Sequence, residues 1–311
     1  MTPQPATFDL SHYGITSHWR WQQQADRRIL FVYAHPDDES FGNAGTILRY
    51  SMQGVAVHYA CATRGEVGTI DPQLLKGFRD AAELRTGEQL RAAEALDLAA
   101  VHFLNHRDSG MQGTPENQHP QALVQQPREQ VAAQIVALIR TLRPQVVVTF
   151  NPYGGYGHPD HIACHHATLL AFDAAADPSA YPDQIAQGLH PWRATRLYFS
   201  TFPPGFLKLM ILVLRLLRRD PRRFGRNNDV DLVRILDEIT PATTLIDTKA
   251  HLARKEQSWI AHKSQGGGRR FGWLPAFIRQ YLSAREQFSR VRPHWPGGSY
   301  ETDLFGEGHA S

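Results

Sequence analysis

Two short segments rich in histidine and aspartate contain the residues of this sequence that could do chemistry. One follows the apolar run 29–33 and reads Ala34-His35-Pro36-Asp37-Asp38-Glu39. The other follows the apolar run 146–150 and reads Tyr156-Gly157-His158-Pro159-Asp160-His161. Nitrogen and oxygen ligands from separate segments are what a catalytic metal site needs when it leaves one position open for water. Together the two segments favour a zinc-dependent hydrolase.

The first segment also has a purely structural interpretation. Pro-Asp-Asp is a good turn sequence, and Asp37 or Asp38 would cap the following helix by accepting backbone N–H bonds. Glu39 would then be a first-turn acid that the helix dipole favours. The second segment weakens this interpretation, because His158 and His161 flank another Pro-Asp turn at another predicted helix start.

The elements that must position these segments are typical of an α/β protein. Apolar runs alternate with longer stretches of helical periodicity, which predicts βα units around a single Rossmann-like, mainly parallel sheet flanked by helices. Strands are expected over 29–33, 55–63, 101–104, 145–150 and 196–201. Helices are expected over 39–52, 80–98, 128–142, 160–172, 249–262 and 275–291. Open sheets of this kind bind ligands at the carboxyl ends of their strands, where both segments should converge as the active site.

The length of 311 residues suits one domain with loop insertions as well as it suits two domains. We expect a catalytic domain over 28–292, an N-terminal arm over 1–27 and a C-terminal tail over 293–311. The formal charge of +3 is small and gives no reason to expect a nucleic-acid partner. Residues 1–28 do not have the pattern of a signal peptide, and two cysteines provide no disulfide framework, so a cytoplasmic location is expected.

Several further motifs give the chain a family resemblance. They are Thr63–Gly68, Arg85–Glu88, Arg107–Met111, His262–Gln265 and Arg285–Phe288. With the two histidine segments, they make the sequence from about residue 28 to residue 291 similar to the PIG-L/LmbE-like de-N-acetylases. Members of that family remove acetyl groups from N-acetylglucosamine conjugates. The resemblance therefore implies an N-acetylated amino-sugar conjugate as the substrate.

The resemblance also implies roles for individual residues. The zinc ligands would be His35, Asp38 and His161. The resemblance implies that Asp37 is the general base rather than a ligand. The turn geometry agrees, since neighbouring residues on a turn point apart and only one of the two aspartates can readily meet the metal. Fe²⁺ is an alternative ion, since a site of two histidines and an aspartate accepts both metals.

Other catalytic and substrate contacts follow from the same resemblance. Tyr156 would stabilise the developing oxyanion, and His158 would act as a general acid or an electrostatic partner. Whether Asp37 or His158 protonates the leaving amine stays open. Arg85 and Asp108 match positions expected to contact sugar hydroxyls, although Arg85 could instead pair with Glu88 one turn along its helix.

Arg64 is a further candidate for substrate binding. It follows the second predicted strand, where its side chain either lines the cleft or helps to turn the chain.

The basic, apolar stretch over 204–228 departs from the family's simplest pattern. It is too short and too charged to span a bilayer, which needs about 20 apolar residues. Lys208, Arg215 and Arg219 fall on one helical face opposite a broad apolar surface. Three interpretations compete: a helix packed on the body, a contact in a homo-oligomer, or an interfacial helix on anionic lipid at the inner membrane face.

Other functions remain in competition with acetyl removal from an N-acetylglucosamine conjugate. One is hydrolysis of another N-acyl amide in an amino-sugar natural product. Another is phosphoester hydrolysis, but two-metal phosphoesterases need more ligands than these segments offer. A non-catalytic carbohydrate-binding protein would not need Asp37 beside Asp38, or Tyr156 near His158.

Overall fold

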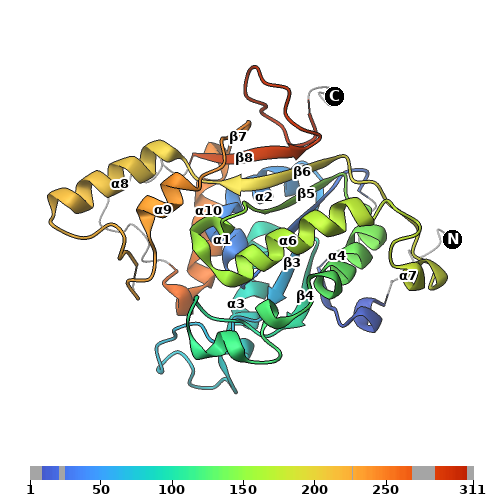
Figure 1. Cartoon of the computed structure of the whole chain (residues 1–311), viewed down its shortest axis with the longest axis horizontal. Coiled ribbons are helices and arrows are strands. Elements are labelled where there is room, and N and C mark those ends of the chain that lie inside the picture. The colour runs from blue at the N-terminus through green and yellow to red at the C-terminus, as the bar shows by residue number, and fades with distance from the viewer. Residues whose placement is uncertain (1–8, 21–24, 226, 268–283, 307–311) are drawn as a thin grey trace.

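The computed structural model describes residues 9–20, 25–225, 227–267 and 284–306. Its sheet has eight strands in the order β1-β4-β3-β2-β5-β6-β8-β7 (Figure 1). They are β1 (Thr16–Trp19), β2 (Arg28–Tyr33), β3 (Ala56–Thr63), β4 (Ala100–His106), β5 (Val146–Phe150), β6 (Arg196–Thr201), β7 (Thr244–Asp247) and β8 (Arg285–Arg292). The central strands β4, β3, β2, β5 and β6 are parallel. The predicted α/β class and mainly parallel sheet are confirmed.

Helices cover both faces of this sheet. Helices α4 and α6 pack together, and α10 packs on α2 and α3 (Figure 1). The helices are α1 (Asp38–Gly42), α2 (Ala44–Ser51), α3 (Ala81–Leu96), α4 (Arg128–Leu142), α5 (Gly154–Gly157), α6 (Pro159–Ala174), α7 (Pro182–Ala186), α8 (Pro204–Leu216), α9 (Leu232–Asp237) and α10 (Leu252–Ala261). Strands β3 and β5 are buried along their whole length because both faces of the sheet are covered.

The predicted strands all occur, but two helix predictions need correction. The helix expected over 39–52 is divided at Asn43 into α1 and α2. The helix expected over 275–291 is wrong for residues 285–291, which belong to β8, and residues 275–283 lie outside the described residues. Strand β8 pairs antiparallel with both β6 and β7, so distant strands determine its structure.

Segments near both ends of the chain contact the sheet. Strand β1 pairs antiparallel with β4, although it lies in the predicted N-terminal arm. In the predicted tail, Glu301 bridges to Thr244 and accepts hydrogen bonds from Arg196 and Arg290. The division into arm, catalytic domain and tail stays a prediction.

A buried arginine joins α4 to the segment that follows α6. The side chain of Arg140 is 1% exposed. It donates to carbonyl oxygens of the α6–α7 segment, those of Ala174, Ala175, Asp177, Ala180 and Tyr181. Carbonyl groups at a helix end lack intrahelical partners, so Arg140 supplies donors where the backbone has none. The second histidine segment lies at the N-terminal end of α6. Arg140 therefore fixes the C-terminal end of the same helix that positions this segment.

Replacing Arg140 with Met should lower the free energy of unfolding by about 3 kcal/mol, because several buried carbonyl groups lose a charged donor. Urea unfolding monitored by circular dichroism measures this. Arg128, exposed at the start of the same helix, provides the matched control. Arg128→Met should change the stability by less than about 0.5 kcal/mol. Equal stabilities for the two variants would contradict this account of Arg140.

Candidate metal centre and active site

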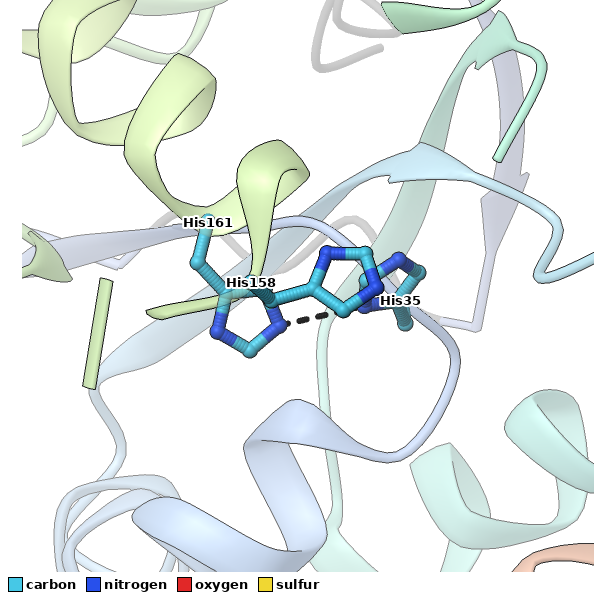
Figure 2. A group of neighbouring side chains, drawn as sticks. All are labelled: His35, His158 and His161. Carbon is cyan, nitrogen blue, oxygen red and sulfur yellow. Dashed lines mark hydrogen bonds between the residues drawn. The ribbon is translucent and has the colours of Figure 1, made fainter. Parts of the chain in front are cut away.

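Three of the predicted site residues meet where β2, α1 and α6 come together. His35 follows β2, Asp38 begins α1, and His161 lies in the first turn of α6. The Nδ1 atom of His35 is 3.1 Å from the Nε2 atom of His161 (Figure 2). The carboxylate of Asp38 lies 3.7 Å from the first of these nitrogens and 3.4 Å from the second. The predicted metal ligands are therefore brought together within the described structure.

The rings of His35 and His161 each form a hydrogen bond on the side away from the other ring. These bonds determine which nitrogen of each ring carries the proton. Nε2 of His35 lies 3.2 Å from the Oδ2 atom of Asp160, and Nδ1 of His161 lies 2.9 Å from the carbonyl oxygen of Gly154. Both oxygen atoms are acceptors, so each of these ring nitrogens carries the proton. When both rings are neutral, as a metal ion requires, the two nitrogens that face each other therefore present lone pairs.

Two lone pairs and a carboxylate oriented toward one point repel one another unless a cation lies between them. Ligand atoms about 2.0–2.2 Å from a tetrahedral zinc ion are themselves roughly 3.3–3.6 Å apart, close to the spacings found here. Although burial opposes it, the carboxylates of Asp108, Asp160 and Asp38 hold the pKa of His35 well above its usual value, so without a metal ion a second ring proton takes the place that a cation would occupy. The residues therefore fit a metal ion in both geometry and charge.

His158 lies beside the predicted ligands, and the N-cap of α6 fixes its tautomer. Its ring centroid is 4.5 Å from that of His35, and the two rings meet edge to face. His158 is the N-cap of α6, and its Nδ1 atom accepts the backbone N–H of Asp160 at 3.2 Å. A neutral imidazole that accepts at Nδ1 carries its proton at Nε2. The ring could join His35 and His161 in a three-histidine metal group, but in this tautomer it is a donor.

Asp37 sits in a strained backbone conformation next to the ligands. Its φ angle of 134° falls in a region that residues with a side chain rarely adopt. Such strain persists only where the surroundings enforce it, and it is concentrated at functional sites. Arg85 donates to the Asp37 carboxylate at 3.1 Å and to the carbonyl oxygen of Pro36 at 2.9 Å, so it holds the strained turn. Burial raises the pKa of Asp37 to about 6 despite this arginine.

The close packing around Arg85 depends on a glycine. Gly65 has a φ angle of 68°, and a Cβ atom at this position would lie 2.0 Å from the Arg85 guanidinium. The buried Arg85 also donates to the Gly65 carbonyl oxygen at 3.1 Å. The pairing of Arg85 with Glu88, which the sequence left open, does not occur here. Glu88 instead accepts hydrogen bonds from the backbone and hydroxyl of Ser264.

Tyr156 packs against the histidines from the side of α5. Its ring meets that of His161 edge to face, with centroids 4.9 Å apart. Burial raises the pKa of Tyr156 well above its usual value, so the phenol keeps its proton and can donate a hydrogen bond.

The remaining predicted residues differ in their distance from the centre. Asp108 reaches it, with one carboxylate oxygen 3.6 Å from the Nε2 atom of His35. Arg64 turns toward α3 and β4, donates to Thr86 and Asn105, and lies over the ring of Phe103. The structure thus places Arg64 outside the group of side chains around the metal ligands.

A second buried pair, not predicted from the sequence, supports the first segment. Glu39 is fully buried, and its carboxylate lies 3.2 Å from the Nε2 atom of His262. Although burial opposes it, hydrogen bonding to His262 lowers the pKa of Glu39. The only signal available in the sequence was His262 within one of the matched motifs, and the two residues are 223 positions apart.

Known proteins similar to this chain show its family. A model of the PIG-L family, described as GlcNAc-PI de-N-acetylase, matches residues 30–172. A protein of Thermobifida fusca is 37% identical over 90% of this chain and 99% of its own length. The chain belongs to this family. The Thermobifida fusca relative is named 1D-myo-inositol 2-acetamido-2-deoxy-alpha-D-glucopyranoside deacetylase, as is a Geodermatophilus obscurus relative, 39% identical over 77% of this chain and 83% of its own length.

Solved structures of other proteins have a fold similar to that of this chain. The N,N'-diacetylchitobiose deacetylase of Pyrococcus horikoshii has a TM-score of 0.59 at 20% identity, covering 85% of this chain and 83% of its own. GalB, a 4-carboxy-2-hydroxymuconate hydratase of Pseudomonas putida, has a TM-score of 0.54 at 17% identity, covering 88% of this chain and 99% of its own. A hydratase and a deacetylase thus share this fold, so the fold alone does not select the reaction.

Among the residues that the structure describes, none belongs to a helix with the length and apolar character needed to cross a bilayer.

Replacing Asp160 with Ala should weaken metal binding by about 10–100-fold, because His35 loses the acceptor that fixes its tautomer. Competition with a chromogenic chelator measures the affinity. Asp173 lies on the same helix with an exposed side chain, so Asp173→Ala is the matched control and should bind metal like the wild type. Unchanged affinity in Asp160→Ala would show that the hydrogen bond to His35 does not organise the site.

Proposed function

We propose that this protein is a zinc-dependent hydrolase that removes the acetyl group from an N-acetylglucosamine-containing conjugate and releases acetate and a free amine. The observation that carries the proposal is the convergence of lone pairs from His35 and His161 with the Asp38 carboxylate, beside the strained Asp37. Relatives that match nearly the whole chain are named as deacetylases of a glucosamine linked to inositol. A conjugate of this class is the substrate that we infer.

His35, Asp38 and His161 would hold the ion, and Fe²⁺ is an alternative to zinc because histidine and carboxylate ligands suit both metals. When bound, such an ion supplies Lewis acidity toward the amide carbonyl and lowers the pKa of a water molecule. The chain's own residues supply proton transfer and hydrogen bonding.

Asp37 is the proposed general base. Its carboxylate would take a proton from the attacking water, and Arg85 would keep it oriented through the hydrogen bond between them. Arg85 is thereby engaged with Asp37, and its predicted contact with a sugar hydroxyl would need a part of the guanidinium that this bond leaves available.

Tyr156 and His158 are the proposed donors to the carbonyl oxygen as negative charge develops on it. A donor directed at developing charge contributes about 2.7–4 kcal/mol in comparable enzymes. The Nδ1 atom of His158 already accepts the Asp160 N–H, so adding a second ring proton would break this cap. We therefore infer that His158 acts as a neutral Nε2–H donor, and that Asp37 returns its proton to the leaving amine.

Asp108 and Arg64 complete the proposed substrate contacts. Asp108 lies next to His35 and could accept a hydrogen bond from a sugar hydroxyl. Arg64 would meet only a substrate that extends toward α3. We further infer a cytoplasmic protein, because Cys61 and Cys164 are both free and buried, as a reducing compartment allows.

Acetate release from a panel of N-acetylglucosamine conjugates, an inositol conjugate among them, tests the reaction. Zinc-loaded wild type should turn over at least one conjugate, and Asp37→Asn should lose at least about 100-fold in kcat because it removes the general base. Asp37→Asn should still bind one metal ion per chain. Turnover of the variant at the wild-type rate would exclude Asp37 as the base. If the metal-loaded wild type released nothing, a different N-acyl amide would be indicated.

A pair of substitutions separates the two roles of His158. Glutamine keeps an N–H donor but cannot be a general acid, so His158→Gln should retain about ten times the kcat of His158→Ala if the ring acts as a neutral donor. Steady-state kinetics on the preferred conjugate measures this. Equal losses of about 100-fold or more in both variants would instead support proton donation by His158.

A further inference from the structure

Helix α8 has two apolar stripes, of which the protein body covers only one. The inner stripe is Leu207, Met210, Ile211 and Leu214, which packs with α9 in a small separate core. The outer stripe is Leu209, Leu212, Val213 and Leu216, whose exposed fractions are 56%, 53%, 38% and 74%. Both follow the spacing i, i+3, i+4, i+7, which normally marks a face that is buried. The outer stripe therefore has the pattern of a contact surface without a contact in this structure.

Basic side chains border this outer stripe. Residues 204–219 include Lys208, Arg215, Arg218 and Arg219 but no acidic residue. All four are exposed, and none forms an ion pair with another described residue. The nearest following acid is Asp220, which accepts the backbone N–H of Arg222. An apolar stripe with an uncompensated basic edge suits a surface that is apolar inside and anionic outside.

The position of α8 connects this surface to the catalytic side of the molecule. Helix α8 starts shortly after β6, at the carboxyl end of a parallel strand, and it stands at one end of the molecule's long axis (Figure 1). The core under its inner stripe also contains Tyr153 and Tyr156, and Tyr156 contacts His161. A partner on the outer stripe would therefore bind one helical layer away from the proposed oxyanion donor.

We propose that α8 docks the protein on an anionic bilayer surface, with its outer stripe inserted at the boundary between headgroups and acyl chains. Lys208, Arg215 and the arginines that follow the helix would contact lipid phosphates. The 13-residue helix is too short to span the membrane, so the contact is peripheral. This proposal does not depend on the proposed deacetylase reaction.

A second copy of the chain is a less suitable occupant. A two-fold contact through α8 places the same surface of each copy against its partner. Such a contact would bring the basic residues of both copies together, and residues 204–219 contain no acid to compensate for them. An anionic lipid surface supplies the missing negative charge.

Vesicle flotation with the full chain tests the proposal. The wild type should float with equimolar phosphatidylglycerol–phosphatidylcholine vesicles and not with phosphatidylcholine alone. Leu212→Glu/Leu216→Glu should bind at least about 100-fold more weakly, because two leucines no longer enter the apolar layer. Lys208→Ala/Arg215→Ala should bind about 30-fold more weakly, and added salt should weaken the wild type in the same direction.

Met52→Glu is the matched control, since Met52 is 58% exposed at the end of α2 and should leave vesicle binding unchanged. Metal binding and circular dichroism of the α8 variants, both unchanged, would show that they fold. Absence of wild-type flotation on the anionic vesicles, or equal flotation of Leu212→Glu/Leu216→Glu, would overturn the proposal. So would a dimer that this double variant dissociates while vesicles bind neither protein, because α8 would then be a contact between copies.

Discussion

The arrangement of the whole site depends on two imidazole nitrogens that face each other with lone pairs 3.1 Å apart. With neither a metal ion nor a proton between the two nitrogens this contact is repulsive, so the rest of the structure must hold it in place. Asp160 and the Gly154 carbonyl oxygen fix the two tautomers from outside, while β2 and α6 fix the ring positions. The parallel sheet, the N-terminus of α6 and the buried carboxylates thereby act on the same few atoms, and they pre-organise negative potential where a metal ion is to bind.

The same region stores strain that the surroundings must balance. Asp37 has a backbone conformation that is unfavourable for an aspartate, and the buried Arg85 and Gly65 hold it there. Strained residues of this kind cost about 1–3 kcal/mol each. The cost is small beside the buried apolar core, but it is concentrated in the turn that presents the proposed base. Stability and catalytic geometry are therefore opposed at this one turn, as is common in enzymes.

Much of this could be predicted from the sequence, and the omissions share a physical cause. The β2 and β5 strands are continuous apolar runs, and the histidine segments follow them at strand ends, so periodicity and local chemistry were enough to find them. Strand β8 is rich in charged residues and owes its conformation to β6 and β7, which local propensity does not reveal. The pairs Arg85–Asp37 and Glu39–His262 join residues far apart in sequence, and only the folded chain defines them.

The contacts of the Glu286 carboxylate affect the order in which parts of the chain can fold during synthesis. The carboxylate accepts the backbone N–H groups of Gly45 and Thr46 at the start of α2, directly behind the first histidine segment, and pairs with the buried Lys255. The contacts with Gly45 and Thr46 span 241 and 240 residues. A nascent chain on the ribosome can therefore complete the parallel strands long before the helix behind His35 gains this acceptor. Because such distant contacts close late, the turn that presents the proposed base should be among the last parts of a newly synthesised molecule to become ordered.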